Sequence, residues 1–400
     1  MQVCFRWALI CLCLLVSRSV LSADAPAPPA SPAESKSPAA EPKSPAAEPK
    51  PGPGKAQFDQ LFSQWKSILA DLRQLRGEYN TAAPERRTEI EGQYGQLIQK
   101  GVNLQPKLIE AAKNAYAAAP NANKELTEFL ASVVYGEVRR DNYEEALRLA
   151  ELLINNQCGV KQLYDVAGIA AFAVSKYDLA EKYFKLAEEN DARKGSGQPS
   201  LNQLIEDFLS NPARYKNAWQ REQQIRAAEA KANDLPRVLL KTNKGDIEIA
   251  LFENEAPIAV ANFISLIEKG FYDGLTFHRV LPGFMAQGGC PTGDGTGGPG
   301  YNIPCECHQP NHRNHFRGSL SMAHAGRDTG GSQFFLTFVP TSFLDGRHTA
   351  FGRVVKGIDV LAKIRRRDPQ APDPPKPDRI IQAKVLQKRP HEYKPQKTGQ

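Results

Sequence analysis

The spacing of apolar residues changes near Leu235, and this change constrains the fold of the 400-residue chain more than any other feature. From Phe58 to about residue 231, apolar residues recur every three or four positions, as they do on one face of a helix. After Leu235, short apolar runs alternate with polar residues and end at turn-forming residues, as in β-strands. We therefore expect one helical and one β-rich domain, for which the chain is long enough.

The first 55 residues belong to neither domain. Arg6 precedes an apolar run over residues 7–16, and small residues follow at Ser22 and Ala23, a pattern typical of a secretory signal. We expect a signal peptide over residues 1–23, a periplasmic or secreted protein, and no membrane contact after cleavage. Residues 24–55 contain the heptapeptide KSPAAEP twice. So much proline prevents a packed core, so a disordered Pro/Ala-rich linker is expected.

The helical domain, expected over residues 56–235, contains an internal repeat. Four identical pairs are each separated by 34 positions: Tyr143 and Tyr177, Ala146 and Ala180, Leu152 and Leu186, Asn156 and Asn190. This period resembles that of tetratricopeptide repeats, in which small residues such as Gly168 let two helices approach closely. Two repeats alone bury little surface, so flanking helices must complete the stack. An ordinary helical bundle is the alternative, and a protein partner on this domain is a hypothesis.

The β-rich domain is expected over residues 236–389. Its predicted strands cover residues 238–242, 246–251, 276–281, 285–288, 319–324, 333–338, 349–355 and 380–387, with helices near 259–268 and 359–364. Many short strands and only two helices indicate an eight-stranded antiparallel β-barrel capped by two helices. Residues 390–400 are polar, and we expect them to form a frayed tail.

Four motifs in this domain carry chemical groups. They are FHRVLPGFMAQGG at 277–289, GSLSMAHA at 318–325, GSQFF at 331–335 and FLDGRH at 343–348. Strand alternation lets Arg279 and Gln287 reach one surface, with apolar side chains as walls. The motifs and their order resemble those of the cyclophilins, which are peptidyl-prolyl cis–trans isomerases. The resemblance covers about residues 236–389 and does not extend to the helical domain.

The reaction implied by this resemblance is rotation about an X-Pro peptide bond. Amide resonance sets a barrier of ~18–20 kcal/mol. In the twisted amide the proline nitrogen regains its lone pair, so a fixed donor aimed at that nitrogen stabilises the transition state selectively. Arginine suits this role because it is always charged and carries several rigid donors. Rotation transfers no atoms, so no cofactor is expected.

The resemblance also implies roles for individual residues. Arg279 is the donor, and the other catalytic residues are Gln287, Phe284 and His348. The substrate-binding residues are Met285, Phe335, Leu344, Gln333, Ala323, His324, Ala325 and Phe343. His324 stands where the family usually has Asn, and Phe343 where eukaryotic members commonly have Trp. Taken singly, the apolar members resemble ordinary core residues, but together with Arg279 and Gln287 they favour a site.

We expect an enzyme that isomerises X-Pro bonds of exported proteins and so assists their folding. The alternative is a non-catalytic module that binds proline-containing peptides while the helical domain contacts partners; a third hypothesis makes the helical domain a holdase. The pairing of Arg279 with Gln287 favours the enzyme, because binding alone needs no such donor. The net charge of +7 is a mild excess, and the basic run at 365–367 is short. Neither predicts a nucleic-acid partner.

Four cysteines follow the predicted cleavage site: Cys158, Cys290, Cys305 and Cys307. A disulfide from Cys290 to Cys305 or Cys307 suits an oxidising compartment and is the preferred interpretation. A metal site is the second, with the candidate ligands Cys305, Cys307, His308 and His312. Free thiols are the third.

The glycine-rich stretch 293–298 matches the pattern GxGxxG. In a dinucleotide site a helix follows these glycines directly, whereas here Pro299 and Gly300 follow. The stretch therefore does not predict a nucleotide site.

Overall fold

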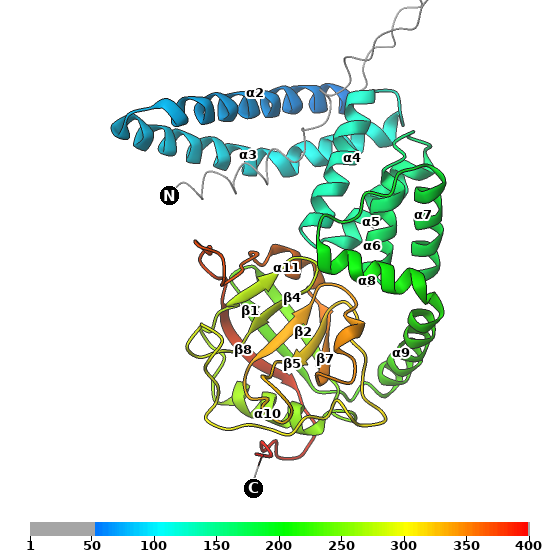
Figure 1. Cartoon of the computed structure of the whole chain (residues 1–400), viewed down its shortest axis with the longest axis vertical. Coiled ribbons are helices and arrows are strands. Elements are labelled where there is room, and N and C mark those ends of the chain that lie inside the picture. The colour runs from blue at the N-terminus through cyan, green and yellow to red at the C-terminus, as the bar shows by residue number, and fades with distance from the viewer. Residues whose placement is uncertain (1–52, 399–400) are drawn as a thin grey trace, which may run out of the picture. The chain divides into compact units, whose positions relative to one another are not determined.

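The structure, a computed structural model, describes residues 53–398, so the predicted signal peptide and nearly all of the predicted linker lie outside the described residues. The chain divides into two compact units at Val133/Val134 (Figure 1). The described part of the first unit consists of α2 (Pro53–Thr81), α3 (Pro84–Ala118) and the start of α4 (Lys124–Arg139). The three- and four-residue spacing becomes the buried face of α2, where Phe58, Trp65 and Leu72 are fully buried.

The second unit begins with helices. After the end of α4 come α5 (Tyr143–Asn155), α6 (Leu163–Ala173), α7 (Tyr177–Glu189), α8 (Pro199–Ser210) and α9 (Pro212–Ala232). Within the described residues, none of the helices in either unit is both long and apolar enough to cross a membrane.

Two turns in this helical segment repeat each other 34 residues apart. Asp141 and Ser175 both have a left-handed backbone, with φ of 60° and 61°. Each accepts a hydrogen bond from the tyrosine hydroxyl two residues later, at 2.8 and 3.4 Å. The predicted repeat spacing is therefore visible in the backbone. Membership of these helices in the tetratricopeptide family stays a prediction.

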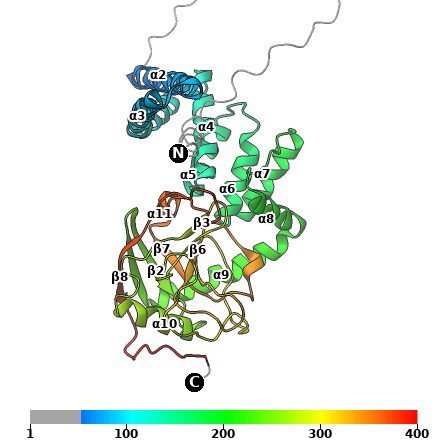
Figure 2. The ribbon, with the colours of Figure 1, turned by 60° about the vertical axis from the view of Figure 1, so that its left-hand side comes forward.

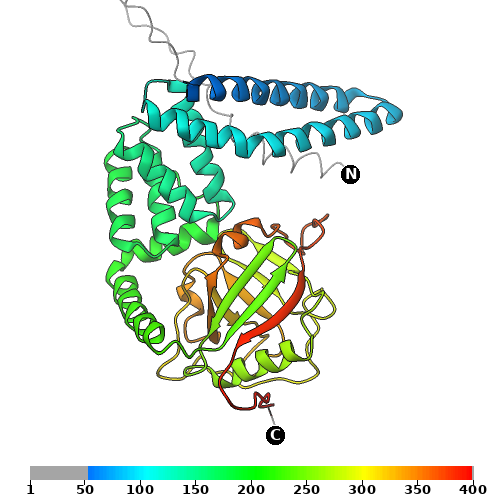
Figure 3. The same ribbon diagram turned by 180° about the vertical axis from the view of Figure 1, so that it is seen from behind.

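The β-rich part of the second unit forms one antiparallel sheet of eight strands in the order β3-β4-β6-β5-β7-β2-β1-β8. The strands are β1 (Arg237–Thr242), β2 (Gly245–Leu251), β3 (Arg279–Leu281), β4 (Met285–Gly288), β5 (Ser319–Met322), β6 (Phe334–Thr337), β7 (Ala350–Lys356) and β8 (Ile380–Gln387). The sheet curls around its core (Figure 3). A single bridge from Thr276 to Arg379 links the segments just before the edge strands β3 and β8. The predicted eight-stranded antiparallel fold is confirmed, as a curled sheet whose edge strands share no continuous ladder.

The two predicted helices are confirmed as α10 (Pro257–Glu268) and α11 (Ile358–Lys363), which lie near opposite ends of the curled sheet (Figures 1 and 3). The core contains Ile249, Phe263 and Phe277, all fully buried. A loop residue caps α10: the Glu306 carboxylate accepts hydrogen bonds from the N–H groups of Ile258 and Ala259, both at 2.9 Å. These are donors that a helix leaves unpaired at its start.

The segment after β8 differs from the expected frayed tail. Tyr393 is only 5% exposed, and its hydroxyl donates to Glu253 Oε2 at 2.9 Å. Further along, the N–H of Thr398 donates to the carbonyl of Asn302 at 2.9 Å. Burial of the Tyr393 ring and these hydrogen bonds fix residues that a polar composition alone predicted to be loose.

Candidate active site

A small apolar cluster lies apart from the main core of the sheet. Met285, Phe335 and Leu344 are nearly fully buried, and Leu281, Phe284 and Ala323 pack against them. They come from β3, β4, β6, the short 3-10 helix η1 (Ser342–Leu344) and the flanking loops. Residues far apart in the sequence therefore meet in one place.

A cavity of about 650 Å³ opens above this cluster. Eleven of the twelve predicted site residues line it: Arg279, Phe284, Met285, Gln287, Ala323, His324, Ala325, Gln333, Phe335, Leu344 and His348. The twelfth, Phe343, is 46% exposed, and its ring centroid lies 5.6 Å from that of Phe284. Phe343 therefore stands next to the wall of the cavity instead of lining it.

The β3–β4 hairpin places the two key polar residues. Arg279 pairs directly with Gln287 in the antiparallel register, so both side chains leave the same face of the hairpin. The Arg279 guanidinium lies 6.0 Å from the centroid of the Phe284 ring. Within the described residues no hydrogen bond or salt bridge holds it. Burial lowers the pKa of Arg279 and the charge of Asp368 opposes this shift, but an arginine stays charged throughout.

Gln333 lies next to Gln287 in the wall of the cavity. Its Nε2 donates to the carbonyls of Gly295 and Gly297 at 2.8 and 2.9 Å, and its Oε1 accepts from Gln287 Nε2 at 3.0 Å. The amide therefore ties the glycine-rich loop to Gln287. The hydrogen bonds of the Gln333 side chain therefore all go to neighbouring residues of the cavity wall.

Two histidine rings form the remaining wall. His324 and His348 stack with centroids 4.0 Å apart. His348 Nδ1 lies 3.0 Å from the carbonyl of Met322, and His324 Nε2 lies 2.8 Å from that of Arg347. Burial lowers the pKa of His348 below the ordinary 6.5, and the charges of His324 and His315 act in the same direction. The neutral ring therefore predominates near pH 7.

The cavity includes residues that the four motifs do not contain. They are Gly295, Thr296, Gly297, Gly298, Pro299, Gly300, Tyr301, Asn302 and Thr329. The glycine-rich run was the available signal, and it was used only to exclude a nucleotide site. Behind Phe335, the His315 ring bridges Asp345 and Ser321 at 2.8 and 2.9 Å. His315 and Ser321 are both buried and the His315 ring stacks on that of Phe335, so this hydrogen-bonded group supports the cavity floor.

The preferred cysteine interpretation is wrong in this structure, because the four cysteines of the described residues are all free thiols. Cys290 Sγ accepts hydrogen bonds from the N–H groups of Gly295 and Gly297 at 3.2 and 3.3 Å. Cys305 Sγ accepts one from Asp328 at 3.1 Å. Burial raises the pKa of the Cys290 thiol, but these amides and Thr292 outweigh it and lower the pKa overall. Both sulfurs therefore accept hydrogen bonds from backbone amides.

The structure does not support the second interpretation of the cysteines, a metal site, either. Among the described residues, no group of three or more His, Cys, Asp or Glu side chains is arranged to hold a metal ion. His308 is exposed, and His312 Nδ1 lies 2.8 Å from the carbonyl of Gln309. Cys305 and Cys307 flank Glu306, which serves the start of α10.

The sequence and structure were compared with known proteins. Residues 237–385 match the family model "Cyclophilin type peptidyl-prolyl cis-trans isomerase/CLD". A peptidyl-prolyl cis-trans isomerase of Helicobacter pylori is 56% identical over 150 residues, which are 36% of this chain and 91% of that protein. Peptidyl-prolyl cis-trans isomerase B of Bacillus subtilis is 56% identical over 122 residues, which are 30% of this chain and 85% of that protein.

Two further proteins match this chain over different shares of their length. Peptidyl-prolyl cis-trans isomerase 9 of Schizosaccharomyces pombe is 30% identical over 328 residues, which are 69% of this chain and 54% of that protein. A solved structure of a Cryptosporidium parvum cyclophilin, determined in the presence of the dipeptide Ala-Pro, is 34% identical and covers 37% of this chain and 98% of its own, with a TM-score of 0.35.

The curled antiparallel sheet and the sequence matches define a peptidyl-prolyl cis–trans isomerase. The chain belongs to the cyclophilin-type family of these enzymes, through residues 237–385.

Proposed function

We propose that this isomerase uses Arg279 to rotate X-Pro bonds of exported proteins and so assists their folding. One observation carries the assignment of the site. The Arg279 guanidinium, which no ion pair holds within the described residues, lines the same cavity as the buried apolar cluster of Met285, Phe335 and Leu344. A proline ring fits an apolar floor, and its nitrogen then lies next to a donor.

The proposed mechanism separates holding from rotating. The apolar cluster removes the proline ring from water and fixes it, while the segment before the proline turns. As the amide twists, its nitrogen regains a lone pair and accepts a hydrogen bond from Arg279. The planar ground state has no such lone pair to offer, so the interaction lowers the barrier instead of only tightening binding.

The polar residues around Arg279 position the substrate backbone. Gln287 Nε2 is engaged by Gln333, which leaves Gln287 Oε1 to accept an N–H from the peptide. Gln333 acts through Gln287 and the glycine-rich loop. The neutral His348 ring closes the apolar pocket without introducing a charge. His324, Ala323 and Ala325 offer the edge along which the peptide lies.

The test compares Arg279→Ala with Arg279→Lys in the full chain, using NMR exchange or a protease-coupled assay on a short X-Pro peptide. We expect the alanine variant to lose kcat/KM by about 100- to 1000-fold, the usual effect of removing one transition-state donor. Lysine keeps the charge but not the rigid fork, so it should restore only part of the rate. Unchanged turnover in Arg279→Ala would contradict the role of Arg279.

Peptide affinity, measured alongside, distinguishes the two classes of function. Retained affinity with lost turnover supports catalysis by Arg279. A folded wild-type protein that binds the peptide but does not accelerate exchange would instead support the non-catalytic binding module.

The exported location rests on the N-terminal pattern of residues 1–23. We expect the protein recovered from the periplasm or the medium to begin at Asp24, which N-terminal sequencing measures. An intact Met1 in protein recovered from the cytoplasm would contradict export.

A further inference from the structure

A tight turn carries one wall of the cavity. Residues Leu281–Phe284 connect β3 to β4, and the N–H of Phe284 donates to the carbonyl of Leu281 at 3.2 Å. Pro282 and Gly283 occupy the centre, and Gly283 has φ of 65°. This is the arrangement of a type II turn, with proline at its second position and glycine at its third. The N–H of Gly283 makes no hydrogen bond within such a turn and must find a partner outside it.

That partner lies outside the residues that match the family. Asp141, in the turn between α4 and α5, accepts the Gly283 N–H through Oδ1 at 2.7 Å. Figure 2 shows β3 on the side of the sheet that is next to these helices. The side chain of Gln198 covers the same glycine, because a Cβ at Gly283 would lie 1.8 Å from Gln198 Oε1. The β3–β4 turn therefore packs against Asp141 and Gln198 of the helical segment.

Asp141 is fully buried, and both of its carboxylate oxygens are engaged. Oδ1 also accepts from the hydroxyl of Tyr143 at 2.8 Å. Oδ2 accepts from Arg366 Nε at 2.8 Å and forms an ion pair with Arg366 Nη2 at 2.6 Å. The carbonyl of Asp141 accepts from Arg317 Nη2 at 2.9 Å. A buried charge needs such complete pairing, so the position of the carboxylate is well determined.

The repeated turn provides a comparison within the same chain. Ser175 has the backbone conformation of Asp141 and also meets a tyrosine hydroxyl, but no hydrogen bond links it to the sheet among the described residues. A serine is therefore sufficient to build this turn. The carboxylate of Asp141 is needed only for the sheet and its β3–β4 turn.

The neighbouring wall of the cavity is held in a similar way. Tyr215 of α9 donates its hydroxyl proton to Asp207 Oδ2 at 2.5 Å, so the Ser342 hydroxyl, 2.8 Å away, must donate to Tyr215. Ser342 directly precedes Phe343 and Leu344. The Phe284 and Phe343 rings meet, so the helical segment holds the chain on both sides of that contact.

We propose that Asp141 is a positioning residue of the isomerase site, which acts through Gly283 to hold Phe284 and Met285 in place in the cavity that Arg279 lines. The helical segment from residue 134 to 232 is then required for full isomerase activity. The proposal rests on the isomerase activity and on the cavity as the place where the substrate binds.

The test uses two variants that keep the left-handed backbone of residue 141. Asparagine tolerates this conformation and keeps an acceptor for Gly283, whereas glycine tolerates it and removes the side chain. In the full chain we expect Asp141→Gly to lower kcat/KM about tenfold, through kcat more than KM, which equals about 1.4 kcal/mol of transition-state stabilisation. Asp141→Asn should restore most of the rate, although it loses the charge that pairs with Arg366.

The matched control loosens the helical segment elsewhere. Glu229→Gln weakens a buried contact of α9 with Arg313, which is 2.5 Å long in the wild type. We expect this variant to lower the melting temperature while kcat/KM per folded molecule is unchanged. Equal losses of kcat/KM in Glu229→Gln and Asp141→Gly would overturn the proposal, because general loosening would then explain both. Unchanged kcat/KM in Asp141→Gly, together with an inactive Arg279→Ala variant, would overturn the positioning role of Asp141. The assignment of the active site to Arg279 and its cavity would still hold.

Discussion

At the scale of single residues, the surroundings of a side chain decide what it does. In the second unit Arg279 is half-buried and Arg313 is buried. Arg313 is bonded to carboxylates on two sides, whereas no ion pair holds the Arg279 guanidinium within the described residues. The same chemical group therefore serves as a structural link in one place and as an available donor in the other.

Buried histidines make the stability of the fold depend on pH. His278 is 3% exposed, and burial lowers its pKa below 6.5, with the charges of Arg367 and Arg279 acting in the same direction. Between the two pKa values the unfolded chain binds more protons than the folded chain, so the free energy of unfolding rises with pH there. The contribution is complete above about pH 6.5 and is lost as the pH falls through the folded pKa. We expect His278→Leu to show a shallower fall of melting temperature between pH 7.5 and 5.5.

His391 is the matched control, because its pKa shifts the other way. The carbonyl of Glu392 and the carboxylate of Glu253 raise it. Its contribution is therefore present at low pH and is lost as the pH rises, so His391→Leu should steepen the fall on acidification. If the His278→Leu profile has the wild-type slope, the assigned role of His278 in this pH dependence is wrong.

At the scale of elements, helix packing in the second unit depends on one glycine. A Cβ at Gly168 of α6 would lie 2.7 Å from two ring carbons of Phe184 in α7. We expect Gly168→Ala to lower the free energy of unfolding by about 1–3 kcal/mol, because the ring must move to admit the methyl group. Thermal or urea unfolding followed by circular dichroism measures this change.

Gly92 of α3 provides the matched substitution. No atom lies within 4 Å of a Cβ added there. Alanine should therefore stabilise the helix by about 0.5–1 kcal/mol, through its better helix propensity. A Gly168→Ala variant as stable as the wild type would show that α6 and α7 do not approach as closely as described.

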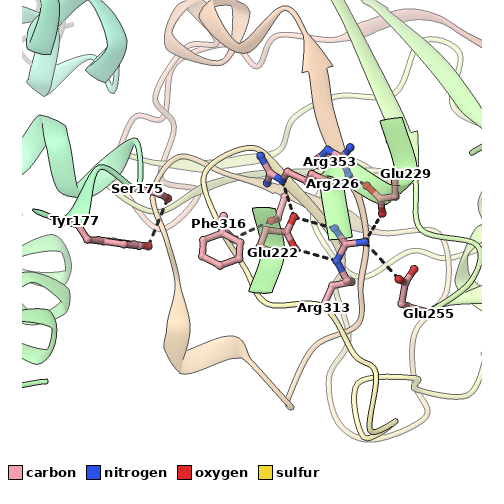
Figure 4. Close-up of polar contacts among 10 residues, drawn as sticks. Ser175, Tyr177, Glu222, Arg226, Glu229, Glu255, Arg313, Phe316 and Arg353 are labelled. Atoms are coloured by element: carbon pink, nitrogen blue, oxygen red, sulfur yellow. Dashed lines mark hydrogen bonds and ion pairs between the residues drawn. The ribbon is translucent and has the colours of Figure 1, made fainter. Parts of the chain in front are cut away.

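At the scale of the whole molecule, a buried ionic network joins α9 to the sheet domain within the second unit (Figure 4). Arg313 donates to both oxygens of Glu222 at 2.8 and 3.0 Å and to Glu229 at 2.5 Å, and its guanidinium stacks 3.8 Å from the Phe252 ring centroid. Burial raises the pKa of Glu222, but the charges of Arg313 and Arg226 outweigh it and lower the pKa overall. The network therefore stays charged at neutral pH.

Removing the central arginine should be costly. We expect Arg313→Met to lower the free energy of unfolding by about 3–5 kcal/mol, because the buried carboxylates of Glu222 and Glu229 lose their most buried counter-charge and keep only Arg226 and Arg353 as partners. Adding Glu222→Gln and Glu229→Gln should recover part of this loss, since neutral amides replace the charges. Urea unfolding, followed by circular dichroism and by tryptophan fluorescence, measures both. No loss in the single variant would contradict the inferred burial of the network.

Much of the fold and site was predictable because the signals are local. Strand alternation and family motifs located β4 and β8 to the residue and placed Arg279 and Gln287 together, since residues of a short hairpin meet by backbone geometry alone. The cysteine pairing was not predictable. It depended on the loop conformation that turns the amides of Gly295 and Gly297 toward Cys290, and loop conformation has no sequence period.

The sequence by itself determined the helical and β-rich parts and the 34-residue period, because these patterns can be read along the chain, and the family motifs located the residues around the cavity. Only the tertiary structure decided that Glu306 caps α10, that Tyr393 is buried and that Asp141 meets Gly283. Asp141 and Gly283 are 142 residues apart in the chain. Nothing in the local pattern distinguishes Asp141 from other acidic side chains, since its partner is an amide that becomes available only when the β3–β4 turn has formed.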